Sequence, residues 1–503
     1  MMEAFVPPEL TAVNAVTRRF IYRRIAEAKA IFQRGKRVNT HRASLVMAAL
    51  LMLPGLALCA PHTMRLDYFH TGNANTELFS IDRVVVEPLE WPGNPQKAID
   101  GSNLGKYFFE VIDRKSNRTI YSRGFSSIYG EWETTDEPKT VSRTFHESLR
   151  FPEPDSPVQV VVKKRDKLNA FHEVWSTLVD PADMFVDRSK PTSPGPLITI
   201  QKSGDPANKV DLLILGDGYT AAERGKFEKD VRRMVDRLFA TSPFKEMRSS
   251  FNVWALCPPA AESGISRPST GVHKQSPLGT TYDAFGSERY VLTFDNRAFR
   301  TAASFAPYEF VEILVNGQTY GGGGIYGQFS TVAADSVWSS YVFIHEFGHH
   351  FADLADEYFT SSVAYAAATD RVEPYEPNVT ALLDQKNLKW KDLVSTDAPL
   401  PTPWDKDGFI KYSQEIQKRR TQIRSQRRPE SEMDGLFLEE KQYVTSMFAA
   451  ERYRGKVGAF EGANYEAQGY YRPEIDCIMF SRDDVPFCAV CRRAIANIIA
   501  MYT

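Results

Sequence analysis

The chain has 503 residues, which is too long for a single small hydrophobic core, so two or three domains are expected. Its 61 Lys and Arg residues nearly balance its 63 Asp and Glu residues. Without a strong basic field, and without aromatic residues interleaved among basic ones, the sequence argues against a protein that binds nucleic acid or anionic lipid. A hydrophobic fraction of 43% is ordinary for a globular protein and fits a soluble enzyme.

The segment 1–60 has the pattern of an N-terminal extension followed by an export signal or anchor. Arg37 and Arg42 precede an apolar run at residues 43–58, which is short for a membrane-spanning helix. Small residues suited to cleavage follow at Ala57, Cys59 and Ala60. We therefore expect a secreted, periplasmic or cell-surface protein, without a stable membrane span beyond this signal or anchor.

Two features of this segment leave alternatives open. Residues 1–36 lie upstream of the signal pattern, so either the true start is further in or the N-terminus stays inside. A lipid anchor at Cys59 is the second alternative for localisation. It is the weaker one, because Leu58 stands where a lipid-attachment sequence has a small residue.

Short strands at close spacing are predicted between residues 65 and 190. They fall at residues 84–86, 107–112, 119–121 and 158–162. The polar stretch 113–118 separates two of them as a hairpin turn does. Packing the apolar faces together gives a small β-sandwich domain that carries no catalytic constellation. A Pro-rich stretch predicts a linker at residues 191–204.

From residue 205 to residue 503, predicted strands and helices alternate. Strands are predicted at residues 212–215, 251–256 and 310–315, and a charged amphipathic helix at 221–240. Alternation of this kind indicates a layer of mixed sheet and helices. The fold class predicted for the whole chain is therefore α+β, with this domain after the β-sandwich.

Four successive glycines occupy residues 321–324. A phosphate-binding loop is one explanation, but the Lys-Ser/Thr ending of such a loop is missing. Because glycine allows another backbone to approach closely, a hairpin or edge strand beside the next helix is the better explanation. An extended peptide can pair with such an exposed strand edge.

His345, Glu346 and His349 form an HExxH pattern after an apolar run at residues 341–344. Residues four apart on a helix lie on one face, so both imidazoles can bind one metal ion. Glu346 is then placed beside the metal to accept a proton from an activated water. The alternative is an ordinary helix that carries two histidines in its core or on its surface.

A third ligand is needed, since catalytic zinc sites usually have three protein ligands. Asp353, Asp356 and Glu357 are the candidates. If the helix continued, Asp353 would stack over His349. If the chain turns sharply at Asp353, Asp356 returns to the metal, and Asp is one of the few residues that accepts a left-handed backbone. We favour Asp356, with solvated acids at a helix end as the alternative.

Residues 405–455 form a highly charged stretch with helical propensity, which we expect to be an insertion in the second domain. A run of charge usually forms a solvated helix face. A cap over the cleft is the alternative.

If Cys59 is removed with the signal, Cys257, Cys477, Cys488 and Cys491 remain. An even count in an oxidising compartment predicts one or two disulfides. A structural zinc site at Cys488 and Cys491 is the alternative, but it lacks a second close pair, since only Cys477 is near.

The stretch HEFGHHFADLADEY at residues 345–358 resembles the signature of the IgA-peptidase family of zinc metallopeptidases, which often reads HEFGHSFAGLADEY. Further segments are similar at residues 210–220, 251–253, 262–266, 471–479 and 487–495. The resemblance spans residues 65–503 and is strongest after 205. One departure is Asp353, which stands where the family commonly has glycine.

The resemblance implies a metzincin-like zinc peptidase domain, because that family is related to the metzincins. Met479 then matches the methionine that packs beneath the metal ligands. The usual third histidine of metzincins is replaced here by Ala355. The resemblance also places a ligand carboxylate in the Asp-Glu-Tyr segment at residues 356–358.

We therefore expect an exported zinc-dependent endopeptidase that hydrolyses peptide bonds in proteins or peptides. His345, His349 and Asp356 would hold Zn²⁺, with Glu346 as general base. An oxyanion donor is sought among the tyrosines Tyr358, Tyr470 and Tyr471. The alternatives are a structural zinc protein without turnover, or a surface protein with a degenerate peptidase domain that binds glycans or host proteins.

Overall fold

The computed structural model describes residues 60–361 and 371–503. The signal and the lipid-anchor position predicted at residues 1–59 lie outside the described residues. Among those that are described, no helix is long and apolar enough to cross a membrane. Pro61–Thr503 forms one compact unit.

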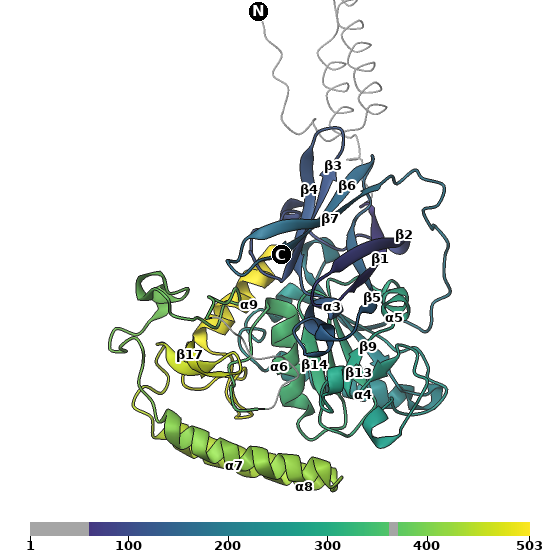
Figure 1. Cartoon of the computed structure of the whole chain (residues 1–503). Coiled ribbons are helices and arrows are strands. Elements are labelled where there is room, and N and C mark those ends of the chain that lie inside the picture. The colour runs from purple at the N-terminus through teal and green to yellow at the C-terminus, as the bar shows by residue number, and fades with distance from the viewer. Residues whose placement is uncertain (1–59, 362–370) are drawn as a thin grey trace, which may run out of the picture. The chain divides into compact units, whose positions relative to one another are not determined.

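Two antiparallel sheets form the first part of this unit and appear in purple and blue in Figure 1. The first has the order β2-β1-β5, with β1 at His62–Gly72, β2 at Glu77–Glu90 and β5 at Arg143–Pro152. The second has the order β4-β3-β6-β7, with β3 at Tyr107–Asp113, β4 at Arg118–Phe125, β6 at Val158–Arg165 and β7 at Phe171–Val179.

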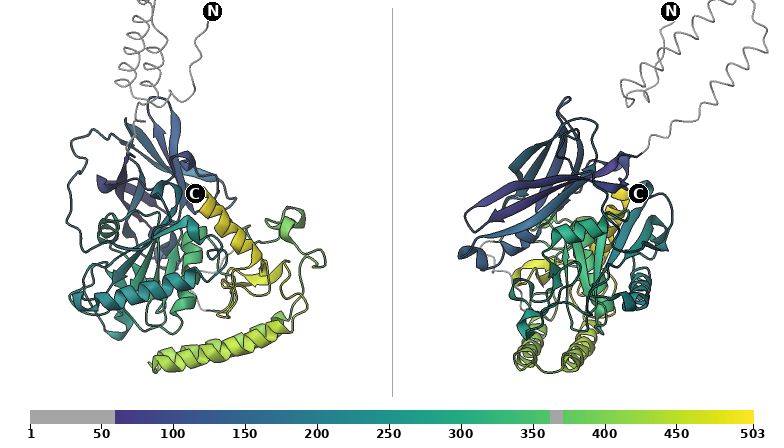
Figure 2. Two further views of the ribbon diagram at one scale, coloured as in Figure 1. Left: turned by 180° about the vertical axis from the view of Figure 1, so that it is seen from behind. Right: turned by 90° about the vertical axis from the view of Figure 1, so that its right-hand side faces the viewer.

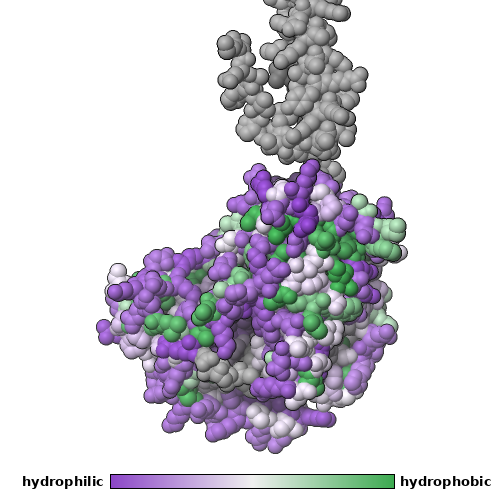
Figure 3. Space-filling view, turned by 45° about the horizontal axis from the view of Figure 1, so that its top comes forward, coloured by the Kyte–Doolittle hydropathy of each residue, from purple (hydrophilic) through white to green (hydrophobic). Residues whose placement is uncertain are grey.

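Both sheets contribute side chains to one core, which includes Leu66 and Phe151 from one sheet and Val111 and Val160 from the other. The predicted β-rich region is confirmed. So is its hairpin, since Asp113 pairs with Arg118. Figure 3 shows hydrophobic residues gathered over this region on a face that is otherwise mainly hydrophilic.

A six-stranded sheet carries the second part of the unit, in the order β14-β15-β13-β9-β10-β8. The bounds are β8 Ile198–Gln201, β9 Val210–Asp217, β10 Phe251–Leu256, β13 Phe310–Val315, β14 Gly322–Ile325 and β15 Phe329–Ala333. The four inner strands are parallel and both edge strands are antiparallel. Every residue of β9 is buried, as expected for a strand between parallel neighbours with both faces covered.

Helices cover both faces of this sheet. Three of them share one core with it: α4 Arg224–Leu238, α6 Ser339–Ala352 and α9 Ala489–Tyr502. A second core on the other face includes α5 Asn296–Ala303 and α3 Ile128–Trp132. Figure 2 shows this layering from two further sides. The predicted α+β class is confirmed.

The helix α4 illustrates how the sequence specifies these contacts. A capping box of Thr220 and Glu223 opens the preceding turn, η5 Ala221–Glu223. Buried residues then recur at helical spacing: Phe227, Val231, Met234, Val235 and Leu238. The predicted helix at 221–240 is therefore present, slightly shortened.

The charged insertion is a helical hairpin of α7 Lys406–Ser425 and α8 Glu430–Ala449, seen along the lower edge of Figure 1. It is helical, as predicted. It is not solvated throughout, because Phe409, Ile416 and Phe437 are buried in the main core, the one that the six-stranded sheet shares with α4, α6 and α9. Two small hairpins complete the strands: β11 Thr280–Thr281 with β12 Leu292–Thr293, and β16 Phe460–Ala463 with β17 Glu466–Arg472.

Short 3-10 turns connect these elements. They are η2 Pro95–Lys97, η3 Glu137–Lys139, η4 Pro206–Asn208, η6 Arg248–Ser250, η7 Pro268–Thr270, η8 Ala284–Gly286, η9 Gln385–Asn387 and η10 Lys391–Leu393.

Two expectations need correction. The predicted linker at 191–204 contains β8, because the β-branched residues after Pro196 pair with β10 as an edge strand. The prediction of disulfides is wrong: in the described chain Cys257, Cys477, Cys488 and Cys491 are all free.

Candidate metal centre

The helix α6 holds His345 and His349 one turn apart, with their Nε2 atoms 3.2 Å from each other. The helix is fixed by its apolar side, where Phe343, Phe347 and Phe351 are buried in the main core. Packing therefore sets the direction in which both imidazoles point.

The helix ends at Asp353, which adopts the left-handed conformation with φ 51° and ψ 39°. This is the turn expected from the sequence. The Asp353 carboxylate accepts a hydrogen bond from Gly105 N–H at 2.6 Å, so the turn is also tied to the β-rich region. Asp353 therefore forms the turn, and its carboxylate is bonded to Gly105 instead of facing the histidines.

Beyond this turn, Asp356 comes back to the two histidines. Its Oδ1 lies 3.0 Å from His345 Nε2 and 3.3 Å from His349 Nε2. Glu357 points elsewhere and contacts Asn378 and Cys491. Of the three acidic residues considered from the sequence, the structure brings Asp356 to the histidines.

The three atoms form a nearly equilateral triangle. In a tetrahedral zinc site, ligand atoms about 2.0–2.1 Å from the metal are about 3.3 Å from one another. The observed separations of 3.0–3.3 Å fit that arrangement. Two imidazole nitrogens and a carboxylate oxygen are also ligand types that zinc accepts. The residues present therefore fit a zinc ion.

Further hydrogen bonds orient each candidate ligand. His345 Nδ1 lies 2.9 Å from the carbonyl oxygen of Ile478, and His349 Nδ1 contacts that of Leu354. If Nδ1 carries the proton and donates it to these carbonyls, each Nε2 presents a lone pair to the triangle. The second oxygen of Asp356 accepts a hydrogen bond from Tyr465 OH at 2.5 Å.

The electrostatics of this cluster favour a cation at its centre. Burial opposes the charged form of Asp356, yet the neighbouring imidazoles of His349 and His345 hold its pKa well below the usual range. Burial likewise opposes protonation of His349, but Asp356 raises the pKa of His349 to about 9. The carboxylate thus holds a positive charge at the triangle, which a divalent metal would also supply.

Glu346 follows His345 on α6 and lines the same cavity. Burial raises the pKa of Glu346, the two imidazoles oppose this effect, and Asp356 adds to it. A carboxylate whose pKa is raised is a better proton acceptor at neutral pH than an ordinary glutamate.

The cavity above the triangle has a volume of about 430 Å³ and contains His345, Glu346, His349 and Asp356 in its lining. The β-rich region also lines it, through residues that include Lys106, Glu131 and Arg165. That region was expected to carry no catalytic constellation, and it contributes walls to the cavity.

Sequence reasoning missed Arg289 and Tyr465. Arg289 lines the cavity and donates a hydrogen bond to Tyr358 OH at 3.0 Å. Neither residue belongs to a recognisable pattern, and their positions follow only from the folded chain. Of the three tyrosines considered, Tyr358 lines the cavity, whereas Tyr470 accepts a hydrogen bond from Val372 N–H and Tyr471 pairs with Glu461.

The four glycines lie where β14 passes α6. A Cβ atom at Gly324 would be 2.3 Å from the carbonyl oxygen of Glu346, and one at Gly322 would be 2.5 Å from Val342. The expectation of an edge strand beside the helix is confirmed, since β14 ends the sheet and pairs with β15 on one side. Glycine is required there for close approach.

Met479 is fully buried. Its sulfur would be 3.0 Å from a Cβ atom at Gly348, the residue just before His349. The methionine therefore packs under the helix turn that holds the two histidines, although about 130 residues separate Gly348 from Met479.

Comparison with known proteins identifies the family. Residues 198–499 match the model of IgA Peptidase M64, and residues 57–176 match that of the Peptidase M64 N-terminus. No curated protein matches the chain. Because the first match alone covers more than half of the sequence, the chain belongs to the IgA peptidase M64 family and is a peptidase.

Proposed function

We propose that this protein is an exported, zinc-dependent endopeptidase with a metzincin-like catalytic domain. The observation that carries the proposal is the triangle of His345, His349 and Asp356, which opens into a cavity lined by Glu346. Export rests on the signal pattern before residue 60. The metzincin-like assignment rests on the HExxH helix and on Met479 beneath it.

When bound, zinc would polarise the scissile carbonyl and lower the pKa of the attacking water. Glu346 would accept the proton of that water and pass it to the leaving amine. Its place beside His345 on α6, outside the triangle, leaves its carboxylate available for proton transfer. The raised pKa of Glu346, caused first by burial, supports this role.

Negative charge that develops on the carbonyl oxygen requires a donor. Tyr358 and Arg289 are the groups best placed for it, since both line the cavity and are hydrogen-bonded to each other. Arg289 supplies a fixed positive charge, and it holds the hydroxyl of Tyr358 in position. Tyr465 has a different role, because its hydroxyl is bonded to Asp356.

The strand β14 offers an edge to the main chain of a substrate. The backbone groups of Gly322 point away from β15. Its N–H donates to the carbonyl oxygen of Arg289, and its carbonyl oxygen accepts from the N–H of Val291. Because backbone groups of alternate residues point to the same side, those of Gly324 also point away from β15, where the cavity lies. An extended peptide paired there would pass the triangle, which suits an endopeptidase.

The test uses the full chain and an unlabelled protein substrate such as casein. We expect about one zinc per chain at the triangle, hydrolysis at internal bonds, loss of hydrolysis on chelation and recovery on zinc addition. His345→Ala should remove both this metal and activity. A zinc-loaded protein that cleaves no protein substrate, or hydrolysis that survives full metal removal, would contradict the proposal.

A further inference from the structure

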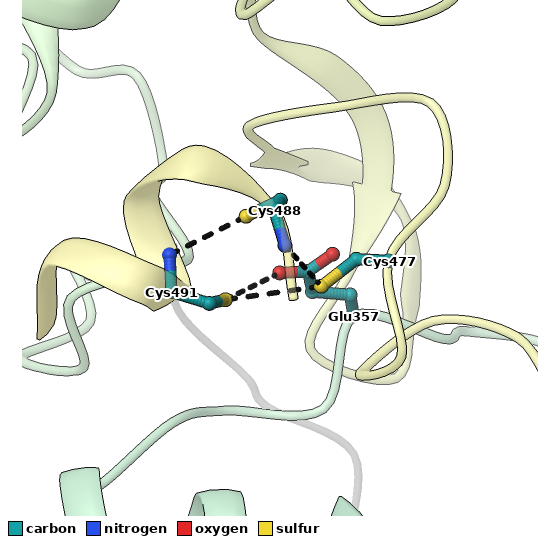
Figure 4. A group of neighbouring side chains, drawn as sticks. All are labelled: Glu357, Cys477, Cys488 and Cys491. Carbon is teal, nitrogen blue, oxygen red and sulfur yellow. Dashed lines mark hydrogen bonds between the residues drawn. The ribbon is translucent and has the colours of Figure 1, made fainter. Parts of the chain in front are cut away.

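A second group of metal-ligating side chains lies behind the candidate metal centre. Figure 4 shows Glu357, Cys477, Cys488 and Cys491 grouped together, with Cys491 in contact with both Cys477 and Glu357. One ligand atom from each lies within 4.8 Å of the others, and all four residues are buried. Three of them come from the C-terminal segment, and Glu357 comes from the stretch that follows the turn at Asp353.

Two of the separations match those of ligands around one metal ion. Cys477 Sγ and Cys491 Sγ are 3.9 Å apart, and Cys491 Sγ is 3.4 Å from the Oε1 atom of Glu357. Sulfur atoms about 2.3 Å from a tetrahedral zinc lie about 3.8 Å from one another, and a sulfur and an oxygen lie slightly closer. A disulfide needs sulfur atoms about 2.05 Å apart.

Ordinary core packing does not account for Glu357. Buried cysteines serve as small hydrophobic residues, but a carboxyl group among them requires partners. Asn378 donates to Oε1 at 2.9 Å, whereas Oε2 has no hydrogen-bond partner within the described chain. Glu357 is fully buried, so this oxygen lacks solvent as well. A cation bound through Oε1, the oxygen that contacts Cys491, would neutralise this buried carboxylate.

Backbone N–H groups and a helix N-terminus face the sulfur atoms, and they oppose the burial that raises the pKa of the Cys477 and Cys491 thiols. Cys488 is the N-cap of α9 and Cys491 lies in its first turn, where the helix dipole stabilises negative charge. The backbone N–H of Cys488 donates to Cys477 Sγ at 3.2 Å, and that of Cys491 donates to Cys488 Sγ at 3.4 Å. Such bonds stabilise thiolates and orient them toward a metal.

A buried arginine offsets part of the negative charge that the thiolates and the carboxylate would keep after binding one divalent metal. Arg472 is fully buried, and its guanidinium bonds to the carbonyl oxygens of Ile475 and Gly462 instead of to a carboxylate. Its positive charge acts on Glu357 and on Cys477. Thiolates and a carboxylate with one divalent metal carry a net negative charge, which this arginine reduces.

We propose that Glu357, Cys477, Cys488 and Cys491 bind a second zinc ion in a closed, four-coordinate structural site. Thiolate-rich, tetrahedral sites select zinc, and closure by four protein ligands leaves no position for a substrate. Sequence reasoning set a zinc site aside because it found no second close pair of cysteines. The fourth ligand is a carboxylate that is far from the cysteines in sequence.

This second ion would hold the residues of the candidate metal centre in position. Glu357 adjoins Asp356, and Cys477 is two residues before Met479. Between Cys477 and Met479 lies Ile478, whose carbonyl oxygen contacts His345 Nδ1. Fixing Glu357 and Cys477 to one metal would therefore fix Asp356, His345 and the methionine together.

The experiment measures metal content and sulfur coordination in the full chain. We expect two zinc ions per wild-type chain, and one in a variant with both His345→Ala and His349→Ala. X-ray absorption of that variant should show a mainly sulfur shell at about 2.3 Å. The candidate metal centre contains no sulfur ligand, so the two sites give different spectra.

Substitution of a single thiol supplies the complementary test. Cys488→Ser should reduce zinc content from two ions to one, whereas Cys257→Ser, a cysteine outside the cluster, should retain two. Should Cys488→Ser fail to fold, the absorption spectrum of the histidine variant still decides. A zinc shell of nitrogen and oxygen alone in wild type, or a disulfide among the three cysteines found by mass after alkylation, would overturn the proposal.

Discussion

The backbone N–H of Glu357 donates a hydrogen bond to the carbonyl oxygen of Met479 at 2.9 Å. This bond joins the stretch after the HExxH helix to the Cys477-Ile478-Met479 segment. Asp356 precedes the donor, and Met479 packs against Gly348 between the two candidate histidine ligands. Two distant pieces of sequence are thereby held at a common site.

Glu346→Gln should retain zinc and lose nearly all hydrolysis, by about 10²–10⁴-fold if only the proton-transfer contribution is removed. Gln has almost the same shape as Glu but accepts no proton at neutral pH. The measurement is turnover of casein together with zinc content per chain. If the variant loses its metal as well, Glu346 is a ligand or a fold element, and its role as a base is wrong.

Asp356→Ala should abolish zinc binding at the triangle, because one of three protein ligands is removed. Asp353→Gly is the matched control: glycine adopts the same left-handed backbone, and it is the residue common in the family, so zinc should be retained. Glu357→Ala should lower sulfur-coordinated zinc instead. Metal content and X-ray absorption of the three variants separate these outcomes, and equal metal content in all three would refute the assignment of Asp356.

Much of this site follows from sequence, because its geometry is local. HExxH spacing on a helix brings His345 and His349 together, and the tolerance of Asp353 for a left-handed backbone allows Asp356 to return. Strands such as residues 251–256 and 310–315 were also identified, since a continuous apolar run marks a buried strand.

The remainder depends on contacts between distant segments. Arg289 reaches Tyr358 from 69 residues away, and Tyr465 reaches Asp356 from 109. Cys491 meets Glu357 across 134 residues, so counting cysteines alone predicted a disulfide instead of a mixed thiolate and carboxylate cluster. No local periodicity encodes such pairs.

Met479→Leu should cost little stability, under about 1.5 kcal/mol, because the swap conserves volume and removes no chemistry. Activity should fall only modestly. Met479→Asp should instead disrupt the site, since it buries an unpaired charge beneath the helix. Thermal unfolding and zinc content test both. A normal melting temperature and full zinc in Met479→Asp would show that the methionine does not support the metal ligands.

Gly324→Ala should impair hydrolysis by displacing β14 or α6. The added methyl group would lie 2.3 Å from the carbonyl oxygen of Glu346 and 3.0 Å from His349 Cβ, and the first of these is a backbone atom that cannot rotate away. Overpacking of this kind costs about 1–3 kcal/mol. The shift would also move Glu346 and the edge proposed to pair with substrate.

Gly435→Ala provides the control for this glycine. Gly435 lies within α8, where an added Cβ atom meets nothing within 4 Å. Alanine should therefore stabilise the protein by about 0.5–1 kcal/mol through helix propensity, with hydrolysis unchanged. Denaturant unfolding and casein turnover compare the two variants directly. Equal activity and stability in Gly324→Ala and wild type would show that β14 does not need to lie so close to the HExxH helix.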